Sequence, residues 1–228
     1  PGISGVVDLS PRFAKEKATV EAVFTVSEDL TEDPVAIASG TAMSKYSVVG
    51  RTYQYRLLVV ADDVEGARTV TITLKDPAGN ESGTLAGGGF TVDLTAPSVA
   101  TWDVKSGPYR SPKDGEGPIA ATISLTASEP LDPASGGLRL RIGTAAEAVC
   151  PAGVAGDFAC TFDVPFNLPP QDGLEGQKVV LAELRDAAGN FTVETIGAMT
   201  FDFTPPVIAS SNASPKPAKI GDVVTYTL

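Results

Sequence analysis

Histidine is absent from this chain of 228 residues. Its absence removes the commonest general base, the serine and cysteine dyads that depend on it, and most zinc and copper sites. Long apolar runs are also absent, because no stretch approaches the roughly 18 residues that a membrane helix needs. Neither a nucleophile–base pair nor a cofactor loop is visible in the sequence. We therefore expect a protein that is not an enzyme and that has no membrane span.

Basic side chains are scarce, since 17 Lys and Arg against 28 Asp and Glu give a net charge of −11. The acidic residues are scattered along the chain, and this balance argues against nucleic acid as a partner, because phosphates demand lysine and arginine. It suits a secreted surface kept soluble by repulsion, or one that collects divalent cations. Hydrophobic residues make up 43% of the chain, which is enough to build packed cores.

Two phrases occur twice in the chain. Residues 75–80 (KDPAGN) return as residues 185–190 (RDAAGN), and residues 90–97 (FTVDLTAP) correspond to residues 199–206 (MTFDFTPP). This spacing matches a whole domain of about 100 residues, so the repeated unit is a domain and not a short motif.

The repeat predicts three segments, with boundaries at 1–97 for the first domain, 98–206 for the second, and 207–228 for the truncated start of a third. A Ser-Pro-basic tripeptide at residues 10–12, 111–113 and 214–216 sets the register of the three copies. The sequence has no initiator methionine and no basic-then-apolar leader. We therefore expect a piece of a longer array of repeats.

Apolar and polar residues alternate at a period of two in several segments, among them residues 19–26, 70–74, 90–94 and 121–127. This alternation, rich in β-branched residues, predicts half-buried strands. Turn clusters of Gly, Asn and Asp bound the strands, and no segment has convincing helical periodicity. Several short strands in each repeat predict an all-β protein made of antiparallel β-sandwiches.

The two phrases carry a resemblance to a known family. An Asp-x-Ala-Gly-Asn turn followed by a strand ending in Val-Asp-x-Thr-Ala-Pro resembles the bacterial Ig-like repeats of large secreted and cell-surface proteins, and residues 128–131 (SEPL) resemble a third hallmark. The resemblance covers essentially the whole chain and implies tandem Ig-like sandwiches. In such proteins the domains form stalks, adhesins or appendages of multidomain enzymes, and some coordinate calcium at domain junctions.

An Ig-type topology places four polar residues at the junction of the two domains. Asp93 ends the first domain, Glu129 follows the second strand of the next, and Asp186 and Asn190 lie in its last hairpin. Calcium takes six to eight hard oxygen ligands, and these side chains with turn carbonyls and water would supply them. A junction Ca²⁺ is therefore one interpretation of the repeated phrase.

A structural interpretation of the same phrase stays open. Asp accepts backbone hydrogen bonds at the start of a turn, and Gly or Asn takes the left-handed conformation that closes a hairpin. That need alone accounts for an Asp-x-Ala-Gly-Asn phrase without any ion.

Cys150 and Cys160 are the two cysteines of the chain. Their short separation, with glycines between them and alternating segments outside, predicts a disulfide that pins a hairpin loop. Closing such a loop contributes about 2–3 kcal/mol in the chain-entropy model. A reduced, catalytic or metal-binding pair is the alternative, but the sequence offers no histidine to complete it. The disulfide also indicates an oxidising compartment, in agreement with secretion.

Several polar and aromatic residues have two interpretations. Trp102, Tyr109, Tyr53 and Tyr55 are candidates for a sugar-stacking platform, although packing is the favoured role. The acidic segment that ends in Glu65, which the second repeat matches at Glu175, is interpreted as a solvated turn between strands.

The leading hypothesis is therefore an extracellular structural or adhesive module, a stalk or surface-fibre segment whose partners are the neighbouring Ig-like domains of the same chain. One alternative is a module that binds an extracellular protein or glycan through a loop such as 150–160 and is appended to a secreted enzyme. Another is a filament subunit, in which the alternating strand at 218–228 pairs with the sheet edge of another subunit.

Overall fold

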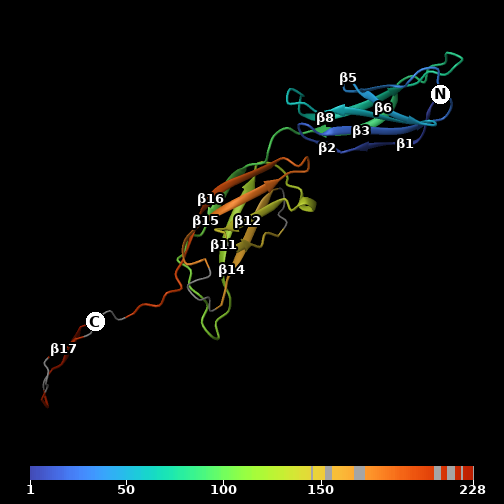
Figure 1. Ribbon diagram of the computed structural model, residues 1–228. Helices are drawn as coiled ribbons and strands as arrows, with labels where there is room; N and C mark the ends of the chain where they lie inside the picture. The colour runs from blue at the N-terminus through green and yellow to red at the C-terminus, as the bar shows by residue number, and fades with distance from the viewer. Residues whose placement is uncertain are drawn as a thin grey trace.

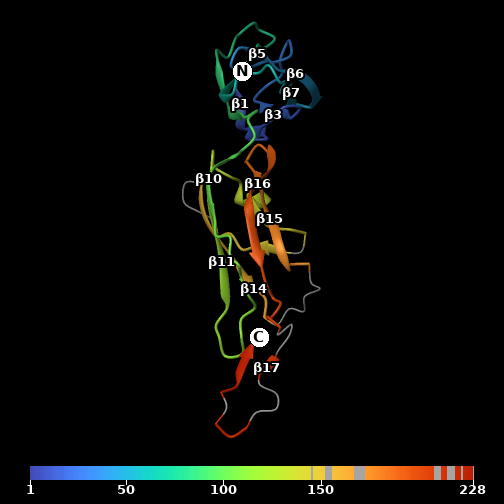
Figure 2. The same cartoon turned by 90° about the vertical axis from the view of Figure 1, so that its left-hand side faces the viewer.

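The computed structural model describes residues 1–144, 146–151, 156–166, 173–207, 212–214, 219–221 and 223–227. Two all-β sandwiches lie end to end, and the chain passes from the first to the second through one short linker (Figures 1 and 2). In the described part of the chain, no helix is long and apolar enough to cross a membrane.

The first sandwich consists of two sheets with the strand orders β1-β3-β7-β6 and β2-β9-β8-β4-β5. Its strands are β1 (Ile3–Ser10), β2 (Phe13–Ala14), β3 (Thr19–Val26), β4 (Val35–Ala38), β5 (Thr41–Ala42), β6 (Ser44–Val49), β7 (Thr52–Leu58), β8 (Gly66–Thr73) and β9 (Leu85–Val92). The short β2 runs parallel to β9, and the other described pairs of this sandwich are antiparallel.

Alternation in β3 shows why these residues form a strand. Every second side chain, from Val20 to Val26, is buried in the core between the sheets, while the intervening residues face outward. Phe24 is the largest of them, and burying such a side chain stabilises the fold by about 1.5–3 kcal/mol. Tyr53 and Tyr55 of β7 stack on Phe24 with ring centroids 5.9 and 5.8 Å away. The two tyrosines therefore have the packing role that the sequence favoured.

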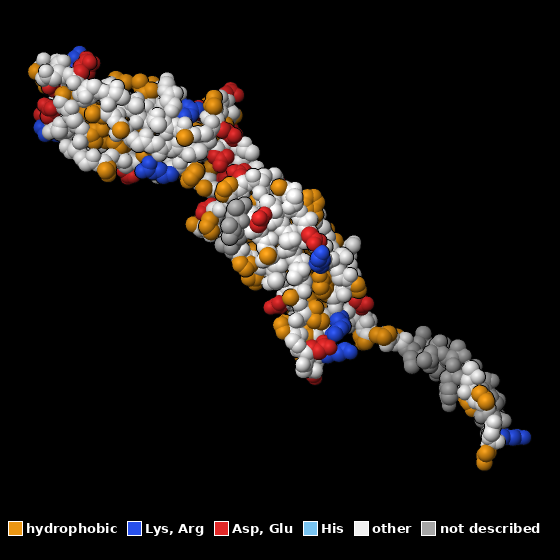
Figure 3. Space-filling model, turned by 180° about the vertical axis from the view of Figure 1, so that it is seen from behind, with side chains coloured by type: hydrophobic (Ala, Val, Ile, Leu, Met, Phe, Trp, Pro, Cys, Tyr) orange, Lys and Arg blue, Asp and Glu red, His pale blue; other side chains and the backbone are white. Residues whose placement is uncertain are grey.

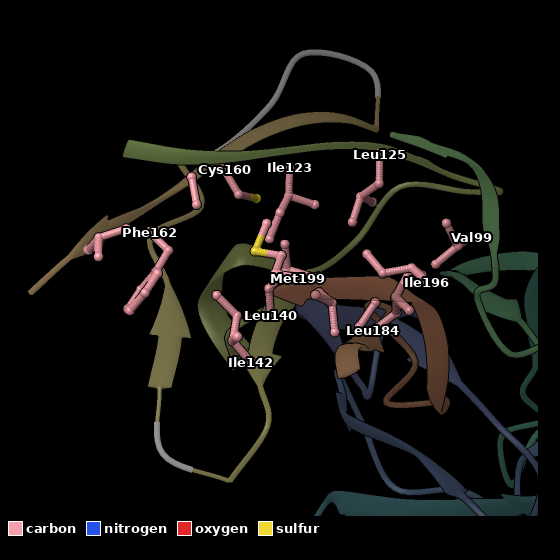
Figure 4. Packing of buried hydrophobic residues seen from close by; sticks show 14 of the residues in the cluster. Val99, Ile123, Leu125, Leu140, Ile142, Cys160, Phe162, Leu184, Ile196 and Met199 are labelled. Atoms are coloured by element: carbon pink, nitrogen blue, oxygen red, sulfur yellow. The ribbon is translucent and has the colours of Figure 1, made fainter. Parts of the chain in front are cut away.

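The second sandwich has sheets with the orders β10-β11-β14 and β13-β12-β15-β16. Its elements are β10 (Val99–Val104), β11 (Ile119–Ala127), the 3-10 helix η1 (Pro133–Ser135), β12 (Leu138–Ile142), β13 (Ala146–Ala148), β14 (Asp157–Val164), β15 (Gly176–Arg185) and β16 (Phe191–Phe201). Side chains from both sheets interdigitate in its core, where Ile123 and Leu125 face Leu140, Leu184 and Met199 (Figure 4).

The Ser-Pro register of the sequence is wrong for the second repeat. In the first domain the amide of Asp93 donates to the carbonyl of Ala14 (3.0 Å), and in the second the amide of Asp202 donates to the carbonyl of Tyr109 (2.9 Å). Tyr109 is therefore the counterpart of Ala14. Ser111 follows Tyr109 in the chain, whereas Ser10 precedes Ala14, so the two serines are not equivalent. The connection from β10 to β11 is longer than that from β1 to β3, so a shared dipeptide does not mark a shared position.

The two domains differ in the middle of the repeat, at one edge of a sheet. In the first, β6 is a full edge strand on β7. In the second, the corresponding edge is reduced to Val149, which exchanges two backbone hydrogen bonds with Thr161 of β14 (2.7 and 2.9 Å). The disulfide between Cys150 and Cys160 is confirmed, with the two Cα atoms 4.3 Å apart. Its cysteines are the chain neighbours of Val149 and Thr161. The second domain therefore secures this edge of the sheet with a covalent bond, whereas the first domain secures it by pairing of β6 with β7.

The predicted third repeat is described only in part, at residues 207, 212–214, 219–221 and 223–227. Within residues 207–228 the structure describes a short antiparallel pair, β17 (Asn212–Ser214) with β18 (Thr225–Thr227). Of the alternating strand expected at 218–228, Thr225–Thr227 form β18 and pair with β17 of the same chain, while Ala218, Asp222 and Leu228 lie outside the described residues.

Candidate metal site at the domain joint

The linker between the sandwiches is short and anchored in both cores. Leu94 packs against the core of the first domain, and Val99 belongs to the core of the second. Thr95, Ala96, Pro97 and Ser98 alone separate these anchors, and Pro97 is itself buried. Because proline fixes its own φ and restricts the residue before it, this connection has little freedom to bend.

The entry end of the second domain contains the repeated turn. Asp186 accepts hydrogen bonds from the backbone amide of Asn190 at Oδ1 (2.9 Å) and from the Asn190 side-chain amide at Oδ2 (2.8 Å). Gly189 takes the left-handed conformation, with φ of 86°, that closes the turn.

The first repeat folds its copy of the phrase in the same way. Asp76 accepts from the Asn80 amide and side chain, both at 2.8 Å, and Gly79 has φ of 85°. The turn interpretation of the phrase is therefore confirmed in both repeats, and a further role depends on what faces the turn.

Three carboxylates from both sandwiches meet at the joint. Asp93 directly follows β9, Glu129 follows β11, and the buried Asp186 directly follows β15. One carboxylate oxygen of each residue lies within 4.8 Å of those of the other two. Acidic side chains gather at the waist between the two lobes in Figure 3. The structure thus brings together three of the four residues that the sequence selected as ligands.

Asn190, the fourth, reaches the joint in a different role. Its side-chain amide nitrogen donates both to Asp186 and to the backbone carbonyl of Asp93 (3.0 Å). It therefore orients one carboxylate and ties the second domain to the end of the first.

Crowding of like charges perturbs the joint carboxyls. Burial, together with the Asp186 and Glu65 carboxylates, raises the pKa of Asp93. Burial raises the pKa of Glu129 as well, followed by the charges of Asp93, Asp186 and Glu65. At the other end of the first domain, hydrogen bonds from the Asn80 side chain and backbone lower the pKa of Asp76. Asn80 therefore favours the negative charge of Asp76. At the joint, several carboxylates lie together, and the negative charges of Asp93 and Glu129 are disfavoured.

A lysine of the first domain also crosses the joint. Lys15 donates from Nζ to the backbone carbonyl of Gly189 at 2.7 Å. Its ammonium lies beside the acidic turn and partners a carbonyl; among the described residues no carboxylate oxygen lies within 4.0 Å of it. Lys15 could not be selected from the sequence, because its partner is a backbone atom of the other domain.

The donor set of the joint fits a hard divalent cation. Carboxylate oxygens are the ligands that Ca²⁺ prefers, and the three side chains offer six of them, part of which Asn190 already occupies. Turn carbonyls and water can complete a shell of about six to eight oxygens. Zinc and copper fit poorly, because no imidazole or thiolate belongs to the cluster.

The chain matches none of the family models and none of the curated proteins. Among solved structures it is similar to fibronectin(III)-like modules of Clostridium thermocellum CbhA, with 11% identity and a TM-score of 0.45, over 87% of this chain and 95% of that chain. An I-band fragment of titin is 12% identical with a TM-score of 0.42, over 86% of this chain and 64% of that chain. The IG1+IG2 structure of DIP-gamma is 9% identical with a TM-score of 0.38, over 90% and 99%. At these identities and TM-scores the matches add nothing to what the sheets of this chain define by themselves, a tandem of β-sandwiches, as the sequence predicted.

The raised pKa values of Asp93 and Glu129 give the joint a defined pH dependence. A carboxyl group with a raised pKa binds its proton more tightly in the closed joint than in the open one. In a chelator, protonation therefore stabilises the joint, and this contribution is lost as the pH rises from about 4 through the raised values. We expect interdomain order, measured by small-angle scattering in EDTA, to fall as the pH rises through the raised pKa values of Asp93 and Glu129.

Two variants test this prediction. Glu129→Gln removes one titrating group and should flatten the profile, whereas Glu28→Gln, its counterpart in the first repeat, should leave it unchanged. Added Ca²⁺ should reverse the slope, because protons compete with the ion for the same carboxylates. A chelated joint that becomes more ordered as the pH rises would contradict the assignment.

Proposed function

We propose that this chain is a stiff segment of an extracellular stalk or surface fibre, secreted or displayed on a bacterial cell surface, with no enzymatic role of its own. The joint is the observation that carries the proposal: Asp93 of the first sandwich and Glu129 and Asp186 of the second place carboxylate oxygens within 4.8 Å of one another. Resemblance of the repeated phrases to bacterial Ig-like repeats supports the same role.

We further propose Ca²⁺ as the ligand of this joint. When bound, the ion would neutralise the carboxylates and connect the last strand of one sandwich to the entry loops of the next. Asp93 supplies the ligand of the first domain, and Glu129 and Asp186 supply those of the second. Asn190 keeps Asp186 oriented through two hydrogen bonds. A joint held in this way transmits force between domains without bending.

Calorimetric titration with Ca²⁺ and small-angle scattering test the proposal together. Extracellular calcium modules bind with dissociation constants of about 0.1–1 mM, and we expect a single site in that range. EDTA should broaden the distribution of interdomain angles. Absence of binding heat together with an identical scattering profile in EDTA and calcium would refute the calcium part of the proposal.

One observation favours a second candidate function, glycan binding. Trp102 on the edge strand β10 is 54% exposed and lines a shallow hollow of about 280 Å³ together with Phe158, Asp103, Ser124 and Asp157. Aromatic faces and carboxylates are suited to sugar rings and hydroxyls. Trp102 is the only tryptophan, so its emission on titration with a neutral oligosaccharide such as cellohexaose separates this candidate from a purely structural role.

A further inference from the structure

A serine holds the chain where it enters the second sandwich. The amide of Ser98 donates to Oγ of Ser128 (2.9 Å), and the amide of Ser128 donates to the carbonyl of Ser98 (2.8 Å). The first repeat has the same pair, in which Gly2 and Ser27 exchange bonds of 2.9 and 2.8 Å. The serine of the repeated Ser-Glu dipeptide therefore fixes the backbone of the incoming chain in both domains.

A glutamate holds the chain where it leaves the first sandwich. Oε1 of Glu65 accepts from the amide of Leu94 and from the hydroxyl of Thr95, both at 2.7 Å. Glu65 is exposed in the turn between β7 and β8, as the sequence predicted, and its carboxylate has the additional role of holding the linker.

The second repeat reproduces this exit contact. Glu175 accepts from the amide of Phe203 at 2.9 Å and from the hydroxyl of Thr204 at 3.4 Å. Leu94 and Phe203 both pack against the core of their own domain, so the glutamate fixes the chain at the point where it leaves that core.

We propose that Glu65 and Ser128 form a two-ended clamp that sets the direction of the interdomain linker, and that Glu175 and Ser27 are the same device at the outer ends of this pair of domains. The inference rests on the proposed stalk function and names the residues that position its joint. It does not depend on a cation, because none of the clamp bonds involves the carboxylates assigned to Ca²⁺.

The clamp restricts the linker at both of its ends. Glu65 fixes the amide of Leu94 and the side chain of Thr95, and Ser128 fixes both backbone groups of Ser98. Between them, Pro97 has a fixed φ, and the residue before a proline is restricted to extended conformations. Successive sandwiches therefore keep one relative orientation, which a stalk needs if its reach is to grow with every repeat.

The test measures interdomain order in chelator by residual dipolar couplings, which report whether two domains share one alignment tensor. In the wild type we expect one shared tensor even in chelator, because loss of the ion widens the spread of interdomain angles around the orientation that the clamp sets and does not abolish that orientation. Glu65→Ala and Ser128→Ala should each remove it, so that the domains require separate tensors. Glu175→Ala and Ser27→Ala, the same substitutions at positions outside this joint, should leave it intact.

Glu65→Gln distinguishes geometry from charge. Both bonds end on one oxygen of Glu65, and a glutamine Oε1 can accept both, so this variant should keep the shared tensor although it has lost its charge. Thr95→Val should weaken the order less than Glu65→Ala, because the Leu94 bond remains. Thermal unfolding checks that Glu65, which is exposed, is not needed for the fold of its own domain.

Three outcomes would overturn the clamp: a shared tensor in Glu65→Ala, disorder in Glu65→Gln equal to that in Glu65→Ala, or an equal effect of Glu175→Ala. All three are read in EDTA, so they are independent of calcium. Failure of calcium to bind would remove the proposed ion and leave the clamp result standing, whereas loss of the clamp with intact calcium binding would do the reverse.

Discussion

Replacing Asp186 by Asn is expected to lower the affinity of the joint for Ca²⁺ by at least about tenfold, because loss of an outer-shell partner alone typically costs about 10–100-fold. Asp186 is buried, and one oxygen of its carboxylate lies within 4.8 Å of carboxylate oxygens of Asp93 and Glu129. An amide in its place removes a full negative charge from the site while keeping nearly the same volume. Isothermal titration with Ca²⁺ measures the change directly.

The first repeat supplies a matched control for this variant. Asp76 makes the same two bonds to Asn80 that Asp186 makes to Asn190, with every distance at 2.8 or 2.9 Å. Asp76→Asn should therefore alter the turn to a similar extent without changing calcium affinity. Equal losses of affinity in the two variants would mean that the ion does not sit between the domains.

The expected effect of Asp186→Asn on the order of the joint has opposite signs with and without calcium. Without a cation, Asp186→Asn removes one of the charges that raise the pKa values of Asp93 and Glu129. The chelated joint should then be more ordered at neutral pH than in the wild type, although calcium no longer strengthens it. This opposite response to calcium and chelator is characteristic of a cation site built from repelling carboxylates.

Much of the fold could be predicted from the sequence because its physical basis is local. The alternation of apolar and polar residues at 19–26 predicts a strand with one buried face. β3 has that burial pattern along its full length. The convergence of Asp93, Glu129 and Asp186 could be predicted for a related reason. An Ig-type strand order puts the end of one domain beside two particular loops of the next, whatever the side chains are.

Glu65 and Lys15 could not be selected in this way. Their partners include backbone amides and a carbonyl, at Leu94 and Gly189, and backbone groups are present at every residue. A glutamate followed by glycine in a polar loop has the composition of a solvated turn. The one available signal was that the Glu-Gly dipeptide recurs at residues 175–176, since a purely solvated position has little reason to repeat.

Asn190 shows the limit of assigning ligands by residue type. An amide side chain offers both an acceptor and two donors, and the sequence does not say which of them faces the joint. In the structure its donors are engaged, on Asp186 and on the carbonyl of Asp93. Its contribution is to orient a carboxylate and to tie two domains, which residue identity alone does not reveal.

Replacing Phe201 by Ala is expected to destabilise the second sandwich by about 3–5 kcal/mol, a large part of the stability of a typical domain. Phe201 is 1% exposed and contacts three rings, with centroids 5.8 Å from Tyr109 and 5.9 Å from both Phe162 and Phe203. Truncation leaves a cavity that these neighbours cannot fill without moving strands of both sheets. The first sandwich shares none of these contacts, so its stability should be unchanged.

The reporter for this experiment is built into the chain. Trp102, the only tryptophan, belongs to β10 of the second sandwich, so its fluorescence follows the unfolding of that domain alone, whereas circular dichroism follows both. In chelator, Phe201→Ala should move the fluorescence midpoint in urea to lower concentration and leave a second transition visible only by circular dichroism. Phe24→Ala, which removes a core ring of the first sandwich, should leave the fluorescence midpoint unchanged and shift only the transition seen by circular dichroism. If Phe24→Ala shifts the Trp102 transition as far as Phe201→Ala does, the two sandwiches unfold as one unit, and the joint is a continuous core and not a clamped hinge between independent domains.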